Sequence, residues 1–285
     1  MNFGFGNFEI TPIVDQLFYL DGGTMFGVVP KKLWSRLLPV DDQNLIPMAC
    51  NLYLVKANDK NYLVDSGLGV DLSELEQKIY GASNNSALDE KLLSMNMSVE
   101  DIDVVLLTHL HTDHVGGSVR RKGDKFVTRF PNAIYYVQER EFADAIDPDE
   151  RSKAAYSEDR LKALADSGQL KFIDGDTEIA PGIKAVLTGG HTAGHQGYEF
   201  TSGGETVVAY CDIIPMTGHV RIPYVASVDL FPLDTLRFKR KLLKRLVAEK
   251  LVVAFGHDHA VTLARLEEEK HKIIVKPLEE ITTAK

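Results

Sequence analysis

Short apolar runs separated by glycine and polar turns recur along the chain, and they predict the strands of a mixed α/β protein. Residues 8–20 form such a run, and Pro12 within it indicates a strand near the edge of a sheet. Residues 51–55 and 61–64 flank a short polar turn and are predicted to pair with each other. Further strands are predicted at residues 104–107, 133–137, 183–187, 198–201, 206–211 and 251–255.

Helical periodicity is clearest in two stretches. Residues 86–97 place three leucines on one face, and Ser86 is positioned to cap the helix. Residues 236–248 have an apolar face and a strongly basic one, which includes Lys239 and is predicted to point outward. The basic face could bind phosphate or could simply be solvated. Helices are also compatible with residues 139–146 and 150–166.

The segment 21–47 is rich in apolar side chains but follows neither the strand nor the helix period. A long, irregular, apolar connection is typical of an active-site wall or an interface. It could instead cover one end of the core, and Trp34 fits either role. We expect Met25, Phe26 and Trp34 to contribute apolar surface to a substrate pocket.

Composition limits the class of protein. With 285 residues, of which 44% are hydrophobic, the chain can bury the core of a single large α/β domain. The net charge of -9 argues against nucleic acid or an anionic membrane as a partner. Only two cysteines, no secretory pattern at the start and no apolar run of about 20 residues indicate a soluble, cytoplasmic protein.

Four side chains that commonly bind metals follow the predicted strand at 104–107. His109, His111, Asp113 and His114 lie within six residues, before two glycines that begin a closely packed helix. Imidazole and carboxylate groups at this density suit a divalent metal such as zinc without any thiolate. The alternative is a chance group of surface histidines.

The same pattern recurs at three other strand ends, which carry His191, Asp212 and His257. Strand ends along one sheet edge converge in space, so these groups can meet the first four. Seven ligands are too many for one tetrahedral zinc but suit two metals that share a carboxylate. Asp65, at another strand end, could orient a ligand histidine or cap the following turn.

This set resembles the signature of metallo-β-lactamase-fold hydrolases, in which a His-x-His-x-Asp-His loop is followed at a distance by histidine, aspartate and histidine. The resemblance covers residues 51–257 and implies an αββα sandwich with an N-terminal extension. It also implies two divalent ions, with Zn²⁺ expected and Co²⁺, Mn²⁺ or Fe²⁺ as alternatives. One ion would bind His109, His111 and His191, the other Asp113, His114 and His257, and Asp212 would bridge them.

A narrower resemblance links residues 22–31 to quorum-quenching N-acyl-homoserine lactonases and the methyl parathion hydrolase branch. It implies one domain over residues 1–285, with 21–47 as a pocket and dimer segment of a homodimer. The smaller lactonases carry a tyrosine where this chain has Pro215, and Tyr224 is the nearest candidate replacement. His219 is also expected to line the pocket.

The implied reaction is the opening of a lactone ring, with N-acyl-homoserine lactones as the expected substrates. A metal-bridging hydroxide would attack the carbonyl, and Asp113 or Asp212 would pass the proton to the leaving alkoxide. The same ligands would serve an arylesterase or an organophosphate hydrolase, and a non-catalytic metal-binding scaffold is the third possibility. Cys211, beside Asp212, is expected to face away from the site as a core residue on its strand.

Overall fold

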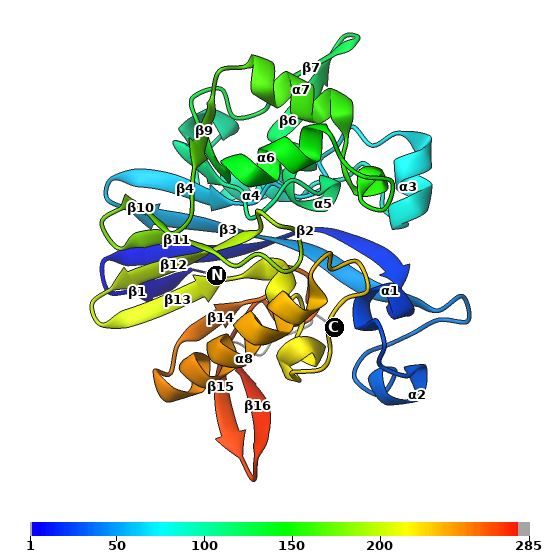
Figure 1. The fold of residues 1–285 in the computed structure, drawn as a ribbon. Helices are drawn as coiled ribbons and strands as arrows, with labels where there is room; N and C mark the ends of the chain where they lie inside the picture. Colours follow the sequence, from blue (N-terminus) through cyan, green and yellow to red (C-terminus); the bar gives the residue numbers. More distant parts are fainter. Residues whose placement is uncertain (1, 279–285) are drawn as a thin grey trace.

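Two seven-stranded sheets pack face to face, with helices on their outer surfaces (Figure 1). The structure is a computed structural model that describes residues 2–278. In spatial order the first sheet contains β1 (Phe3–Phe5), β2 (Phe8–Asp21), β3 (Leu45–Ala57), β4 (Lys60–Val64), β5 (Val104–Leu106), β8 (Ile134–Gln138) and β9 (Leu170–Ile173). The second contains β10 (Thr177–Ala180), β11 (Ile183–Leu187), β12 (Gln196–Ser202), β13 (Glu205–Ala209), β14 (Val252–Ala254), β15 (Leu263–Glu269) and β16 (Lys272–Pro277). A separate hairpin pairs β6 (Val119–Lys122) with β7 (Lys125–Thr128).

The main core lies between the two sheets. Tyr53 and Val55 of β3 meet Tyr198 and Phe200 of β12 there, and all four are buried. Strands in the middle of the sandwich are covered on both faces, so their sequences are continuous apolar runs rather than alternating ones. This is why the sequence predicted these strands well.

The long strand β2 is an edge strand over most of its length, as Pro12 indicated. β1 pairs only with Phe8–Ile10 of β2, whereas β3 pairs with it from Glu9 to Asp21. Among residues 2–278, no strand pairs with the outer side of β2 beyond Ile10, so the missing N–H of Pro12 is tolerated.

The outer face of the first sheet is covered by α4 (Leu88–Ser94), α5 (Thr112–Val115), α6 (Glu139–Ile146) and α7 (Glu158–Asp166). Two of the predicted helices were too long. The helix expected at 86–97 spans only α4, because Ser86 turns to Asp15, which itself accepts the N–H of Leu88. In the region expected to be helical at 150–166, only α7 is α-helical, and a short 3-10 helix at Lys153–Ala155 precedes it.

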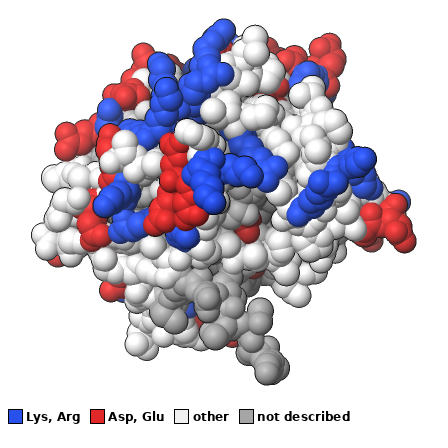
Figure 2. Space-filling view, turned by 90° about the horizontal axis from the view of Figure 1, so that it is seen from below, with Lys and Arg blue, Asp and Glu red and all other residues white. Residues whose placement is uncertain are grey.

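Helix α8 (Pro232–Ala248) covers the second sheet and starts four residues earlier than predicted, with Pro232 in its first turn. Two of its basic residues pair with acids: Arg237 with Asp234, and Arg245 with Glu199 and Glu249. Figure 2 shows the underside of the molecule, where Lys and Arg lie beside Asp and Glu. A solvated basic face therefore fits better than a phosphate-binding one.

The segment 21–47 forms α1 (Gly22–Phe26) and α2 (Lys31–Trp34) at one end of the sandwich (Figure 1). Asp21 caps α1 by accepting the N–H groups of Gly23 and Thr24. Gly22 allows Trp34 to pack closely, since a Cβ there would lie 2.2 Å from the indole ring. Within residues 2–278 no helix is both long and apolar enough to cross a bilayer.

Candidate metal centre

The loop after β5 is held in place by close packing of its glycines. A Cβ at Gly117 would lie 2.1 Å from the carbonyl oxygen of Ser66, and one at Gly116 would lie 2.4 Å from that of Leu68. Ser66 in turn donates its N–H to the carbonyl of His114 at 2.8 Å. The loop is therefore fixed against the turn that follows β4, and its side chains point to the end of the sandwich.

Three histidines converge on one point. Nδ1 of His111 lies 3.0 Å from Nε2 of His109 and 3.0 Å from Nε2 of His191. Ligand atoms of a tetrahedral zinc lie about 3.3 Å apart, given zinc–nitrogen bonds of roughly 2.0–2.1 Å. The spacing of these nitrogens suits one metal ion.

A second group forms beside the first. Nε2 of His114 lies 3.0 Å from Nε2 of His257, and Oδ2 of Asp113 lies 3.8 Å and 3.7 Å from these two nitrogens. The three atoms lie within 4.8 Å of one another. They suit a second ion.

Asp212 lies between the two groups and turns one oxygen to each. Its Oδ2 lies 3.1 Å from Nε2 of His191, and its Oδ1 lies 3.1 Å from Nε2 of His257. Oδ1 is buried and makes no hydrogen bond within residues 2–278. A buried carboxylate oxygen without a partner is costly, so this atom is poised for a cation. The donor set thus fits two divalent ions that share Asp212.

Four of these histidines are oriented by a further hydrogen-bond partner, which contacts the ring nitrogen that faces away from the centre. The pairs are His114 Nδ1 with Asp65 Oδ2 at 2.9 Å, His191 Nδ1 with Asp229 Oδ1 at 2.9 Å, His257 Nδ1 with the carbonyl of Ala49 at 3.0 Å, and His109 Nδ1 with Thr108 Oγ1 at 3.1 Å. Of the two roles considered for Asp65, the structure shows the orientation of a ligand histidine, and its Oδ1 also accepts the N–H of Thr108 at 2.8 Å.

Sequence reasoning missed Asp229. It lies in the loop before α8, is buried and also accepts the hydroxyl of Thr235 at 2.6 Å. Unlike the seven residues at strand ends, it follows no apolar run. The one available signal was a carboxylate shortly before a helix, which predicts a cap rather than a partner of His191.

The electrostatics of the ligand groups favour binding of cations. Burial, followed by the neighbouring histidines, lowers the pKa of His109 and of His111 well below the usual value. Burial alone would raise the pKa of Asp212, but charge on His257 and His191 holds it well below the usual value. Metals bind neutral imidazoles and ionised carboxylates, which His109, His111 and Asp212 supply. Against the effect of burial, Asp212 and other nearby carboxylates raise the pKa of His191 and raise that of His114 to about 10, so these two would release a proton when a metal binds.

A cavity of about 250 Å³ opens over the centre. His111, Asp113, His191, Asp212 and His257 line its floor. Its walls include Leu20, Met25, Met48, Ile79, Tyr80 and Val228. A mostly apolar cavity with converging polar groups at one end is typical of a small-molecule site.

Of the five expected pocket residues, only Met25 lines this cavity. Phe26 stacks between Trp34, with ring centroids 5.2 Å apart, and His219, with centroids 4.7 Å apart. Tyr224 meets the edge of the same phenyl ring. Successive helical residues project in different directions, so α1 turns Met25 to the cavity and Phe26 into the core. The four residues form a support behind the wall.

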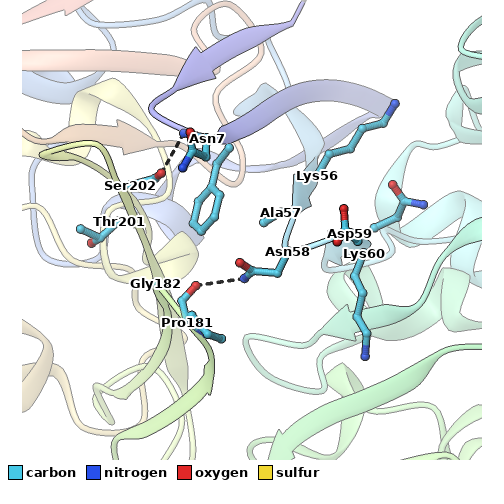
Figure 3. Close-up of a pocket in the computed structure, with 12 residues that line it drawn as sticks. Asn7, Lys56, Ala57, Asn58, Asp59, Lys60, Pro181, Gly182, Thr201 and Ser202 are labelled. Atoms are coloured by element: carbon cyan, nitrogen blue, oxygen red, sulfur yellow. Dashed lines mark hydrogen bonds between the residues drawn. The ribbon is translucent and has the colours of Figure 1, made fainter.

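A larger groove of about 700 Å³ lies at the opposite end of the strands (Figure 3). It runs beside the β3–β4 turn, where Asn58 donates to the carbonyl of Pro181 at 3.0 Å, and Ser202 accepts the N–H of Asn7 at 2.8 Å. The His109–His114 loop follows the C-terminal end of β5, which runs parallel to β4, whereas the groove lies at the start of β4 and is therefore remote from the metal groups. None of the described residues that line the groove is a histidine or cysteine.

Two orientations predicted from the sequence are wrong. Cys211 is not on a strand: β13 ends at Ala209, and a 3-10 helix with positive φ at Cys211 turns its Sγ to within 3.5 Å of Asp65 Oδ2. Lys239 points inward from α8 and donates to the carbonyl of Tyr224. That buried carbonyl needs a donor, and α8 supplies one at the cost of burying an ammonium group.

Comparison with known proteins agrees with this geometry. A profile of the Metallo-beta-lactamase superfamily matches residues 45–272, and the chain belongs to this superfamily. A solved structure, a probable metal-dependent hydrolase from Staphylococcus aureus, is 30% identical, with a TM-score of 0.91 over 98% of this chain and 100% of that one. The protein is a metal-dependent hydrolase with the metallo-β-lactamase fold.

Some of the similar proteins are named for a more specific activity. The N-acyl homoserine lactonase of Bacillus cereus is 25% identical over 238 residues, which are 79% of this chain and 86% of that protein. The dizinc quorum-quenching lactonase AidC, solved with a product, is 22% identical and superposes with a TM-score of 0.81 over 99% of this chain and 98% of that one.

Proposed function

We propose that the protein is a dinuclear metal-dependent lactonase that opens the ring of N-acyl-homoserine lactones. The observation that carries the proposal is Asp212, which presents one oxygen to each of two histidine groups on the floor of an apolar cavity. The names of the relatives supply the substrate class.

The distances between ligand atoms divide the proposed ligands into two groups. His109, His111 and His191 would hold one zinc ion, Asp113, His114 and His257 the other, and Asp212 both. Bound divalent ions of this kind provide hydroxide at neutral pH and polarise an ester carbonyl.

Two carboxylates of the chain can handle the proton of the reaction. Asp113 lines the cavity and is 14% exposed at its side chain, whereas Asp212 is 9% exposed and held ionised by its histidines. A general acid or base must lie within hydrogen-bond reach of the reacting group, and the more exposed carboxylate can reach a substrate in the cavity more readily. We assign the transfer to the leaving alkoxide to Asp113, with Asp212 holding the two ligand groups in register.

The apolar walls suit an acyl chain. Leu20, Met25 and Ile79 come from three separate elements and surround the space over the metal groups. Each methylene that they remove from water contributes about 0.8 kcal/mol. We propose that they bind the tail of the substrate while its ring lies at the floor.

We also propose that residues 1–285 act as one domain whose segment 21–47 serves as pocket wall and subunit contact of a homodimer. Beside that wall, Val28 is 95% exposed, Leu33 46% and Leu17 of β2 53%. Exposed apolar side chains on this segment and on β2 favour a contact with a second copy.

A substrate panel tests the function. The zinc-loaded enzyme is assayed on N-acyl-homoserine lactones of several chain lengths, on phenyl acetate and on paraoxon. We expect the highest kcat/KM on the lactones. Faster turnover of phenyl acetate or paraoxon would make the protein an arylesterase or organophosphate hydrolase, and tight metal binding without any turnover would make it a scaffold.

A further inference from the structure

Arg151 is the one Lys or Arg among the residues that line the cavity over the metal centre. It lies in the loop between α6 and α7, just after a turn fixed by Asp149. The carboxylate of Asp149 accepts the backbone N–H groups of Arg151 and Ser152, each at 2.9 Å. The backbone at Arg151 is therefore anchored, and the exposed side chain borders the cavity.

The guanidinium connects two loops beside the centre. Its Nη2 donates to the carbonyl of Ser227 at 2.7 Å and to that of Asp229 at 3.2 Å. The carboxylate of Asp229 holds His191, which is one of the proposed metal ligands. Arg151 is thus placed on the His191 side of the cavity, one residue away from the ligand groups.

Most of the donor capacity of Arg151 remains available. Arginine has five N–H donors in a planar fork, and in residues 2–278 only Nη2 has acceptors. Its guanidinium forms no ion pair within that part of the chain. Arg151 is a cation with unused donors on the wall of a mostly apolar cavity. Such a residue suits a ligand that places an oxygen acceptor next to it.

We infer that Arg151 is a specificity-determining residue that donates to a carbonyl oxygen on the acylamino arm of the substrate. The inference rests on the proposed lactonase function. With the ring carbonyl at the metal groups, the arm runs along the wall past Arg151, and its oxygen is the amide oxygen or that of a 3-oxo group. A γ-alkyl lactone carries its chain on another ring carbon and has no oxygen beyond the lactone group, so it offers Arg151 no such acceptor wherever the chain lies, and the apolar walls can still bind its methylenes.

The test compares substrates that differ in this oxygen. Zinc-loaded wild type, Arg151→Met and Arg151→Lys are assayed on N-hexanoyl-homoserine lactone, N-(3-oxohexanoyl)-homoserine lactone and γ-nonanolactone. For Arg151→Met we expect kcat/KM on both acyl-homoserine lactones to fall about 10- to 100-fold, mainly through KM, because a charge-assisted hydrogen bond is lost. Turnover of γ-nonanolactone should change less than about twofold, and Arg151→Lys should lie in between.

The two acyl-homoserine lactones identify the acceptor. Equal losses assign the contact to the amide oxygen, and a larger loss on the 3-oxo substrate assigns it to the 3-oxo group. An equal loss on all three substrates, or no loss on any, overturns the inference.

Matched control variants distinguish two roles of Arg151: recognition of the substrate, and a structural link (a strap) between the two loops. Ser227→Ala removes the hydrogen bond from Ser227 Oγ to the carbonyl of Thr24 at 3.1 Å, which loosens the loop that Arg151 contacts, on its α1 side, and leaves the guanidinium in place. Lys153→Met removes an exposed cation from the same loop outside the cavity. Both should keep the wild-type ratio of activities, with unchanged zinc content.

If Ser227→Ala shifts the ratio as Arg151→Met does, Arg151 is a strap and the inference is wrong. A wild type that opens γ-nonanolactone but neither acyl-homoserine lactone overturns the proposed substrate class. An active wild type whose selectivity survives Arg151→Met overturns only the role of Arg151.

Discussion

Asp212 is the residue on which the two ligand groups depend. Elemental analysis of zinc-reconstituted protein should give about two ions per chain, as a shared carboxylate requires. Asp212→Ala should lose at least one ion and nearly all hydrolysis, because the opposed histidines then lack the anion that offsets two dications. Arg237→Ala, on the exposed face of α8, should retain both ions. One ion or none in reconstituted wild type would contradict the two-metal site.

The sequence indicates the proposed ligands far better than their supports. Each proposed ligand is a His or Asp that follows an apolar run, and burial of the strand carries it to a common edge. Ala49 supports His257 through a backbone carbonyl, which any residue could supply. Asp229 reaches His191 only because the loop before α8 folds back on the centre. These long-range contacts depend on tertiary packing, which no local sequence pattern predicts.

At the scale of the element, the neighbouring residues Met25 and Phe26 of α1 have different roles. Met25→Ala should raise KM for long-chain lactones more than for short ones, because Met25 lines the cavity. Phe26→Ala should instead destabilise the fold by about 3–5 kcal/mol, because the ring is fully buried between Trp34 and His219. Kinetics and urea unfolding of both variants check the pair. A chain-length effect confined to Phe26→Ala would reverse these roles.

Helix α8 contains a buried cation whose cost depends on pH. Burial lowers the pKa of Lys239 to about 7, while Asp229 partly opposes the shift. Between pH 7 and about 10 the unfolded chain binds this proton and the folded chain does not, so folding stability rises with pH. Relative to Lys239→Met, wild type should therefore gain roughly one to a few kcal/mol between pH 7 and 9.5 in urea unfolding. Lys244→Met, on the solvated face, should show no such trend, and a constant difference for Lys239→Met would refute it.

The elements themselves were largely predictable where burial imposes a period. The central strands are apolar throughout because both faces are covered, and they were found. The hairpin of β15 and β16 was not predicted, because its outer half is exposed and rich in Glu and Lys. Helix ends were misjudged for a similar reason: the start of α4 is decided by Asp15 of β2, which is far away in sequence.

At the scale of the whole molecule, the apolar surface near the cavity predicts association. Val28 and Leu33 project from the segment 21–47 at the same end of the sandwich as the cavity, which Met25 of that segment lines. Contact with a second copy would remove them from water, so we expect a dimer at micromolar concentration in analytical ultracentrifugation. Val28→Asp with Leu33→Asp should give monomers, because two buried charges without partners would oppose the contact. Leu233 is also apolar and exposed but lies on α8, so Leu233→Asp should leave the dimer intact. A monomeric wild type would reduce the segment to a cover of the core and wall of the cavity, and the lactonase proposal would then depend on the metal centre and the substrate panel alone.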